Sequence, residues 1–126
     1  ARRERVGLFD LSPLGKGDVV GASACDALQG LLTNDLRKVD VGRAQVPSTA
    51  RGWLHAVGNE GLIKLVADAD RGVLVGATSA GPTGGEVLGL LALAVHARVP
   101  IADLRSMIYA YPTFHRGIED ALGRLA

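Results

Sequence analysis

The residues best suited to chemistry lie near the C-terminal end of the chain, in the segment Tyr109-Ala-Tyr-Pro-Thr-Phe-His115. His115 is a candidate proton shuttle, because histidine is the side chain whose charge changes most readily near neutral pH. The alternative is a surface or cap-region histidine in the first turn of the last expected helix. The segment also carries three aromatic side chains, which could serve a core or an interface.

Thiol and metal chemistry find little support in the sequence. Cys25 is the single cysteine, so the chain has no internal disulfide, no dithiol pair and no cysteine-rich zinc site. Asp26 follows it directly, and a neighbouring carboxylate disfavours a nucleophilic thiolate. His55 and His96 are far apart and lack carboxylate neighbours, so we expect no metal site.

A glycine-rich segment, Gly81-Pro-Thr-Gly-Gly85, stands before an expected helix, which is the position of a phosphate-binding loop. It has neither the Gly-x-x-x-x-Gly-Lys nor the Gly-x-Gly-x-x-Gly pattern, and no lysine follows it. We therefore predict a tight turn between a strand and a helix.

Composition restricts the class of protein. The chain has 126 residues, which suits a single domain, with 48% apolar and 21% charged residues. Its net charge is +1, and the small N-terminal cluster of Arg2, Arg3 and Arg5 is best interpreted as a solvated end, so we expect no nucleic-acid partner. The longest apolar run, residues 87–95, is far shorter than the ~20 residues of a membrane span. With no signal peptide visible, we expect a cytoplasmic protein without a membrane partner.

The elements that must position these residues begin with strands. In an extended conformation, the side chains of residues 62–68 would point alternately to the two sides of a strand. Residues 73–77 are β-branched and apolar, which also favours a strand. Asp70-Arg-Gly72 between them suits a turn, so an antiparallel hairpin is predicted. Short strands are also predicted at residues 6–11, 18–20 and 39–46.

Helices are predicted after the hairpin. Residues 86–98 are apolar on more than one side, which indicates a helix buried on most faces. Residues 103–108 suit a short helix, and residues 114–125 a last helix that Thr113 would cap. In the first third, residues 23–32 suit a further helix. The pattern predicts an α+β fold in which an antiparallel sheet packs against helices.

Four motifs in fixed order carry a family resemblance over about residues 39–126: Thr49-Ala-Arg-Gly-Trp-Leu-His55, Gly61-Leu-Ile-Lys-Leu-Val-Ala-Asp68, Gly76-Ala-Thr-Ser-Ala-Gly-Pro82 and Tyr109-Ala-Tyr-Pro-Thr-Phe-His115. Together they resemble the C-terminal dimerisation domain of pyridine nucleotide-disulfide oxidoreductases of the mercuric reductase and dihydrolipoyl dehydrogenase type. The resemblance implies a homodimer and a parent enzyme that uses FAD and NAD(P). We expect neither cofactor in this chain alone.

Residues 1–38 are similar to a different family. Arg5-Val-Gly-Leu-Phe-Asp-Leu-Ser12, Gly15-Lys16 and Leu31-Leu-Thr-Asn-Asp-Leu36 resemble an N-terminal segment of folate-dependent aminomethyltransferases such as the glycine cleavage T protein. The chain is therefore a candidate chimera within one domain, by natural fusion, recombination or design. The segment ends before the region where that family binds folate, so no aminomethyl-transfer residue is carried over.

The resemblance also assigns candidate site residues. It implies that the turn at Tyr111 and Pro112 reaches toward the flavin of a partner subunit. Tyr111 stands where many members carry a proton-transferring histidine, and Arg116 where they carry its glutamate. Because a tyrosine ordinarily has a pKa near ~10, it is a poor base without tuning. The alternative is an interface aromatic with a hydrogen-bonded hydroxyl.

The aromatic cluster supports an interface in its own right. We expect self-association through residues 108–122, centred on Tyr109, Tyr111, Pro112, Thr113 and Phe114. The alternative is that Tyr109 and Phe114 belong to the core of the monomer.

Three functions follow from these observations. The first is a dimerisation module of an FAD-dependent NAD(P)H:disulfide or metal oxidoreductase, inactive by itself. The second is a fragment of an aminomethyltransferase-like folate-binding protein, and the third a chimera that binds no ligand.

Overall fold

The computed structural model describes residues 5–8, 17–20 and 39–125. By its internal contacts the chain divides into two units, residues 1–38 and 39–126. That they form one domain stays a prediction. In the first unit, β1 (Arg5–Leu8) and β2 (Gly17–Val20) pair antiparallel, with Arg5 opposite Val20. The helix expected at residues 23–32, with Cys25, lies outside the described residues.

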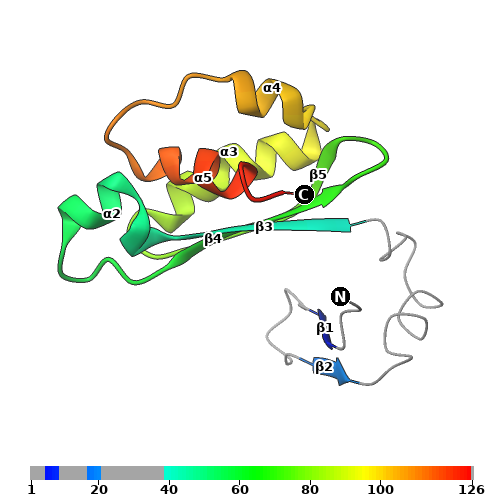
Figure 1. The fold of residues 1–126 in the computed structure, drawn as a ribbon, viewed down its shortest axis with the longest axis horizontal. Coiled ribbons are helices and arrows are strands. Elements are labelled where there is room, and N and C mark those ends of the chain that lie inside the picture. The colour runs from blue at the N-terminus through cyan, green and yellow to red at the C-terminus, as the bar shows by residue number, and fades with distance from the viewer. Residues whose placement is uncertain (1–4, 9–16, 21–38, 126) are drawn as a thin grey trace. The chain divides into compact units, whose positions relative to one another are not determined.

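The second unit is built on a three-stranded antiparallel sheet in the order β3-β4-β5 (Figure 1). The strands are β3 (Val39–Gln45), β4 (Leu62–Asp68) and β5 (Val73–Ala80). On the central strand β4, Ile63, Leu65 and Ala67 are buried, and the residues between them are half-buried. This alternation follows from the period of two in a strand, and it gives the sheet one face that packs on helices.

The β4–β5 hairpin is confirmed, and its turn is fixed by two features. Gly72 has a φ of 63°, which a glycine adopts without steric cost. Asp68 accepts hydrogen bonds from the backbone nitrogen of Arg71 at 3.0 Å and from its Nε at 2.8 Å. These hydrogen bonds hold the pKa of the Asp68 carboxyl below its usual range, the backbone bond most strongly. Strand β5 continues to Ala80, beyond the expected end at residue 77, with a register shift at Val66 and Ala67 of β4.

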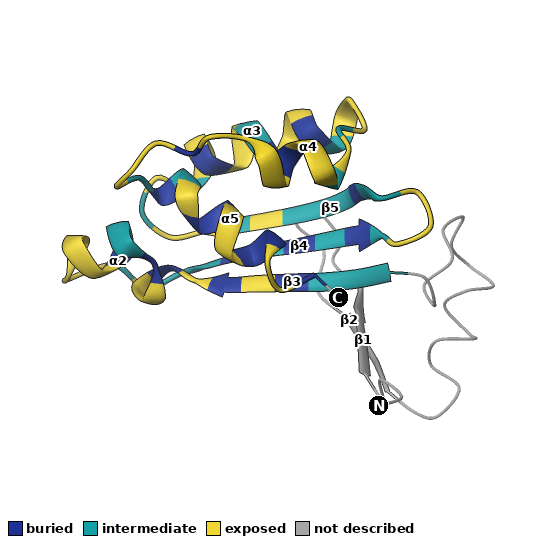
Figure 2. Ribbon diagram, turned by 45° about the horizontal axis from the view of Figure 1, so that its top comes forward, coloured by how far each residue is buried: buried dark blue, intermediate teal, exposed yellow. Residues whose placement is uncertain are grey.

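Helices cover one face of the sheet, as Figures 1 and 2 show. They are α3 (Gly84–His96), α4 (Ile101–Ser106), the short 3-10 turn η3 (Phe114–Arg116) and α5 (Gly117–Leu122). The predicted α+β fold is confirmed. The largest side chains that are fully buried come from both layers: Ile63, Leu65, Leu74, Val87, Leu91, Ile118 and Leu122.

Helix α5 lies very close to strand β3, at Gly42. A Cβ built on Gly42 would stand 3.1 Å from the carbonyl carbon of Ala121 and 3.2 Å from Cγ of Leu125, and closer still to the oxygen of Ala121. The absence of a side chain at this position therefore lets the backbone of α5 rest on the sheet.

Two helical features differ from the expectations. A 3-10 turn η2 (Val46–Ser48) and helix α2 (Ala50–His55) follow β3, and α2 was not predicted. Thr49 caps α2, because its Oγ1 accepts a hydrogen bond from the nitrogen of Gly52 at 3.1 Å. The predicted cap at Thr113 is wrong: its hydroxyl donates to the oxygen of Ala110 at 2.6 Å, and the chain enters η3 without a side-chain cap.

Candidate functional site

The candidate site is the connector between α4 and η3, and α4 is anchored at both ends. At its start, the nitrogen of Ile101 donates to the oxygen of Gly72 at 2.8 Å, which ties the helix to the β4–β5 turn. Near its end, Nη2 of Arg105 donates to the oxygen of Leu122 at 3.0 Å, which ties it to α5. The connector therefore leaves from a fixed point on the helical layer.

Tyr109 holds the first half of the connector against the core. Its side chain is 6% exposed, and its hydroxyl donates to the oxygen of Leu104 at 3.0 Å. Burial raises the pKa of the Tyr109 phenol, and the charge of Glu119 adds to this effect. The hydroxyl is thus kept neutral as a hydrogen-bond donor, and its role is structural.

The next residues turn outward. The Tyr111–Pro112 peptide is cis, and the Tyr111 side chain is 67% exposed. The guanidinium carbon of Arg116 lies 5.4 Å from the centroid of the Tyr111 ring, and Nε of Arg116 lies 3.4 Å from Oε2 of Glu119. The Thr113 hydroxyl closes the turn on Ala110, so an exposed aromatic and a proline are presented on a braced loop.

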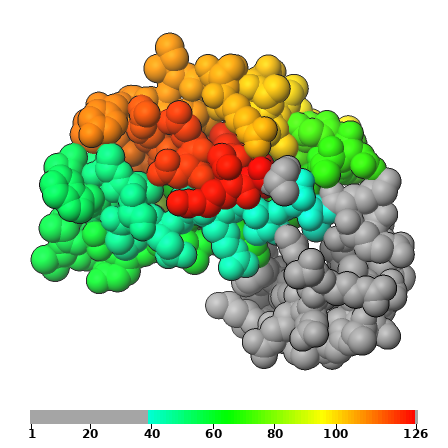
Figure 3. All heavy atoms as spheres, viewed as in Figure 1, coloured from blue at the N-terminus to red at the C-terminus, as the bar shows by residue number. Residues whose placement is uncertain are grey.

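Phe114 holds the other end of the connector. Its ring is 8% exposed and lies 5.5 Å, edge to face, from the ring of His55 on α2. The guanidinium carbon of Arg51 lies 5.7 Å from the centroid of the same ring. This contact joins η3 to α2, so both elements meet at one end of the unit (Figure 3).

The expected aromatic interface is therefore only partly at the surface. Tyr109 and Phe114 belong to the core of the monomer, which was the alternative interpretation, so their side chains are not surface anchors. In a regular extended run Tyr109 and Tyr111 would lie on the same side, because they are two residues apart. Here the chain enters a turn at Tyr111, which the Thr113 hydroxyl closes on Ala110, and Tyr111 is exposed on that turn. Tyr111 and Pro112 remain exposed and Thr113 is half-buried, so an interface through this segment stays a prediction centred on Tyr111.

His115, the other catalytic candidate, lies in η3 and is half-buried. Among the described residues, no group of three or more histidine, cysteine, aspartate and glutamate side chains could hold a metal. Within the same residues, no helix has the length and apolar character needed to cross a bilayer.

Sequence reasoning missed a second exposed apolar group, on α2 and the loop after it. Trp53, Leu54 and Val57 are 75%, 50% and 92% exposed. Ile108, in the connector, is 95% exposed. The signal that could have found α2 is Thr49, a favoured N-cap residue four positions before Trp53.

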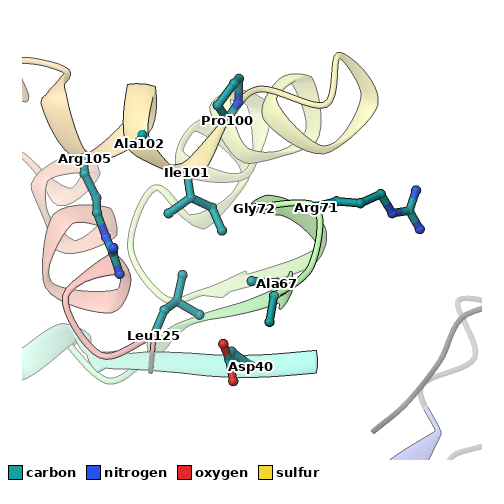
Figure 4. A pocket seen from close by; sticks show the side chains of 10 residues that line it. Asp40, Ala67, Arg71, Gly72, Pro100, Ile101, Ala102, Arg105 and Leu125 are labelled. Atoms are coloured by element: carbon teal, nitrogen blue, oxygen red, sulfur yellow. The ribbon is translucent and has the colours of Figure 1, made fainter. Parts of the chain in front are cut away.

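A hollow of about 470 Å³ lies at the start of α4, away from the connector (Figure 4). Apolar side chains such as Ile101 and Leu125 share its lining with Arg71 and Arg105. Both arginines already bond within the chain, Arg71 to Asp68 and Arg105 to the oxygen of Leu122. The hollow therefore does not offer them as ready partners for an anion.

Comparison with known proteins places the chain in a family. Residues 19–122 match the family described as the pyridine nucleotide-disulphide oxidoreductase dimerisation domain. The match begins before residue 38, so it takes in part of the segment with aminomethyltransferase resemblance. A dihydrolipoyl dehydrogenase from Thermus scotoductus is 34% identical over 96 residues, which are 73% of this chain and 21% of that protein.

A second kind of relative also appears. An aminomethyltransferase from Frankia alni is 34% identical over 103 residues, which are 82% of this chain and 27% of that protein. An alignment of this length extends beyond residue 38, so the similarity is not confined to the N-terminal segment.

Solved structures agree on the fold. LpdA from Mycobacterium tuberculosis superposes with a TM-score of 0.65 at 23% identity, over 85% of this chain and 22% of that one. The chain spans about a fifth of the length of the dihydrolipoyl dehydrogenase it matches. The family match covers most of the chain and the fold agrees with it, so the chain belongs to the family of pyridine nucleotide-disulphide oxidoreductase dimerisation domains.

Proposed function

We propose that this chain joins two copies of an FAD-dependent NAD(P)H oxidoreductase and is not catalytic by itself. The observation that carries the proposal is the turn at Tyr111 and Pro112. It presents an exposed aromatic ring on a loop that Tyr109 and Phe114 fix to the core. Exposed aromatic residues on a rigid support are typical of interface anchors, because little conformational entropy is lost when they are covered.

The turn also fits contact with a flavin held by the partner subunit. Tyr111 and Pro112 are both exposed and offer flat, largely apolar surfaces, which suit the edge of an isoalloxazine ring. When bound, the flavin would supply electron transfer between a nicotinamide and an acceptor. This chain would contribute packing and exclusion of water there, and Tyr111 could donate a hydrogen bond.

Redox turnover would depend on the rest of the parent enzyme. The chain has a single cysteine, so it cannot form the dithiol that disulfide exchange requires. A single cysteine also suits a reducing compartment, and we place the parent enzyme in the cytoplasm.

Two measurements on the purified chain test the proposal. Sedimentation equilibrium should give a dimer, and Tyr111→Ser should weaken it while far-UV circular dichroism stays unchanged. The matched control is Val57→Ser, which alters another highly exposed side chain. Flavin absorbance should be absent, and nicotinamide oxidation should not exceed the background. A monomer, or a stoichiometric flavin held by the single chain, would contradict the proposal.

The similarity to aminomethyltransferases supports a second candidate, a folate-binding fragment. Quenching of intrinsic fluorescence by a reduced folate tests it, since Trp53 is the only tryptophan. Saturable quenching would support the folate-binding function, and quenching no larger than that of free tryptophan would rule it out.

A further inference from the structure

A carboxylate stands on the core-facing side of strand β3. Asp40 lies opposite Ala67 in the β3–β4 register, and Ala67 is 1% exposed on the face of the sheet that the helices cover. Gly42 and Ala44, the next positions on the same side of β3, are also buried, while Asp40 is half-buried. An ionised group at such a position ordinarily has a partner, because taking a charge out of water costs free energy.

The described part of the chain gives Asp40 no such partner. Within it, no hydrogen bond or ion pair reaches the Asp40 carboxylate. Among the same residues, no buried side-chain oxygen or nitrogen lacks a hydrogen bond, so the Asp40 oxygens are not sealed from solvent. Asp40 helps to line the hollow at the start of α4. Its carboxylate therefore meets solvent in that hollow.

The hollow exists because small residues meet where α5 no longer covers the sheet. Ala67, Gly72 and Ala102 line it from β4, from the β4–β5 turn and from α4. Two larger apolar side chains, Ile101 and Leu125, form walls and point toward each other in Figure 4. The volume of about 470 Å³ lies within the range of small-molecule sites and is far more than one water needs.

The two arginines of the lining are engaged within the chain. Nε of Arg71 lies 2.8 Å from Oδ2 of Asp68, which offsets its charge. Nη2 of Arg105 donates to the oxygen of Leu122 at the end of α5, where helix carbonyls carry partial negative charge. Of the titratable groups that line the hollow, Asp40 alone has its charge unmatched by the described chain. A cation therefore finds a carboxylate that it need not take from another partner.

We infer that the hollow binds a small aliphatic amine in its ammonium form. The charged head lies on the Asp40 carboxylate, and the alkyl chain lies between Ile101 and Leu125. A primary ammonium has three donors in a compact head, and apolar walls suit its methylene groups as they suit the stem of a lysine. A metal ion is a poorer occupant, because one carboxylate supplies too few of the oxygen ligands that hard cations require. The site is separate from the Tyr111–Pro112 turn, so it stands apart from the proposed dimer.

Titration of the unmodified chain with matched probes tests the chemistry of the site. In proton–nitrogen NMR spectra, n-butylammonium chloride should shift the amides of Asp40, Ile101 and Leu125 saturably, with a Kd on the order of millimolar. 1-Butanol lacks the charge, butyrate reverses it and ammonium chloride lacks the chain, so each should bind at least about fivefold more weakly. Equal binding of 1-butanol, or no saturable shift with n-butylammonium, would overturn the inference.

Substitutions test the two walls of the site separately. Asp40→Asn keeps the shape and removes the charge, so n-butylammonium should bind at least about fivefold more weakly. The matched control is Asp120→Asn, which alters an exposed carboxylate on α5 outside the lining and should leave binding unchanged. Ala102→Leu should also weaken binding, because it fills the hollow from an exposed position of α4 while keeping Asp40.

Far-UV circular dichroism checks that each variant is folded. If Asp40→Asn fails to fold, Ala102→Leu and the series of probes still decide the question. Unchanged n-butylammonium binding in folded Asp40→Asn or Ala102→Leu would overturn the inference. None of these measurements depends on the oligomeric state, so a failure here would leave the proposed dimerisation module standing.

Discussion

Replacing Gly42 with alanine should destabilise the second unit strongly, because it separates the sheet from α5. The new Cβ would overlap the backbone oxygen of Ala121 and lie 3.2 Å from Cγ of Leu125. A backbone atom cannot move aside as a side-chain tip can, so α5 must shift as a whole. The matched control is Gly76→Ala on β5, where the nearest atom would be Cβ of Val66 at 3.7 Å, an ordinary contact.

The size of the effect follows from what α5 buries. Ile118 and Leu122 are 0% and 1% exposed, and complete burial of such a side chain contributes about 1.5–3 kcal/mol. If the shift of α5 returns half of that surface to water, the two residues together lose about 1.5–3 kcal/mol. Overpacking of a tight core costs about 1–3 kcal/mol by itself. Because a shift of α5 relieves part of the overlap, the two costs do not add in full, and a total loss of about 3 kcal/mol is expected. Gly76→Ala should be neutral or stabilise by about 0.5–1 kcal/mol, since alanine has less backbone entropy to lose.

Urea unfolding followed by far-UV circular dichroism measures the difference. The signal of Trp53 is a poorer reporter, because its side chain is already 75% exposed in the folded chain. For a domain of this size, a loss of about 3 kcal/mol corresponds to a Tm for Gly42→Ala roughly 12–24 °C below that of the unmodified chain. Equal stability of Gly42→Ala and Gly76→Ala would show that α5 does not rest on β3 as described.

Two further substitutions and one fluorescence measurement test other parts of the structure. Tyr109→Phe should lower the free energy of unfolding by about 1–2 kcal/mol, because the oxygen of Leu104 loses its buried donor. Burial raises the pKa of Tyr109 in the folded state. The stability that Tyr109 contributes is therefore fully present below the usual tyrosine pKa near ~10, and it is lost as the pH rises through the pKa of the folded state. Urea unfolding across this range should show a smaller alkaline loss in Tyr109→Phe, and equal losses would contradict the assignment. The pKa of Asp68 is lowered in the folded state, so its effect on stability has the opposite pH dependence. The stability that Asp68 contributes is present at neutral pH and is lost as the pH falls below ~4. Acid titration of Asp68→Asn should therefore show a smaller decline than that of the unmodified chain. Trp53 should emit at long wavelength and be quenched freely by iodide, whereas a blue-shifted, protected emission would mean that another surface covers α2.

Local chemistry explains which elements could be predicted from the sequence. The β4–β5 hairpin was predictable because alternation in residues 62–68 and the turn at Asp70-Arg-Gly72 point to the same structure. Helix α3 was predictable because its apolar positions persist over thirteen residues. Helix α2 escaped prediction because six residues are too few to show a helical period, and Gly52 within them weakens the helical signal.

The candidate site was predictable in position but not in orientation. The order of motifs placed the Tyr-Pro turn correctly between two helices, as the structure shows. The Tyr109 hydroxyl bonds to the oxygen of Leu104, five residues before it, across the end of α4. Phe114 instead packs on His55 and Arg51 of α2, which are distant in sequence and come close only in the folded chain. Helix α3 was expected to be buried on most faces, but Leu93 and Leu88 on its outer side are 65% and 37% exposed. A run of apolar residues does not reveal which side of a helix another layer covers.

Sedimentation equilibrium of the unmodified chain over a range of micromolar concentrations tests whether this domain pairs with a second copy of itself. We expect twice the mass of one chain at the upper end of the range, with reversible dissociation on dilution. A mass equal to one chain throughout, up to tens of micromolar, would refute the proposed dimer.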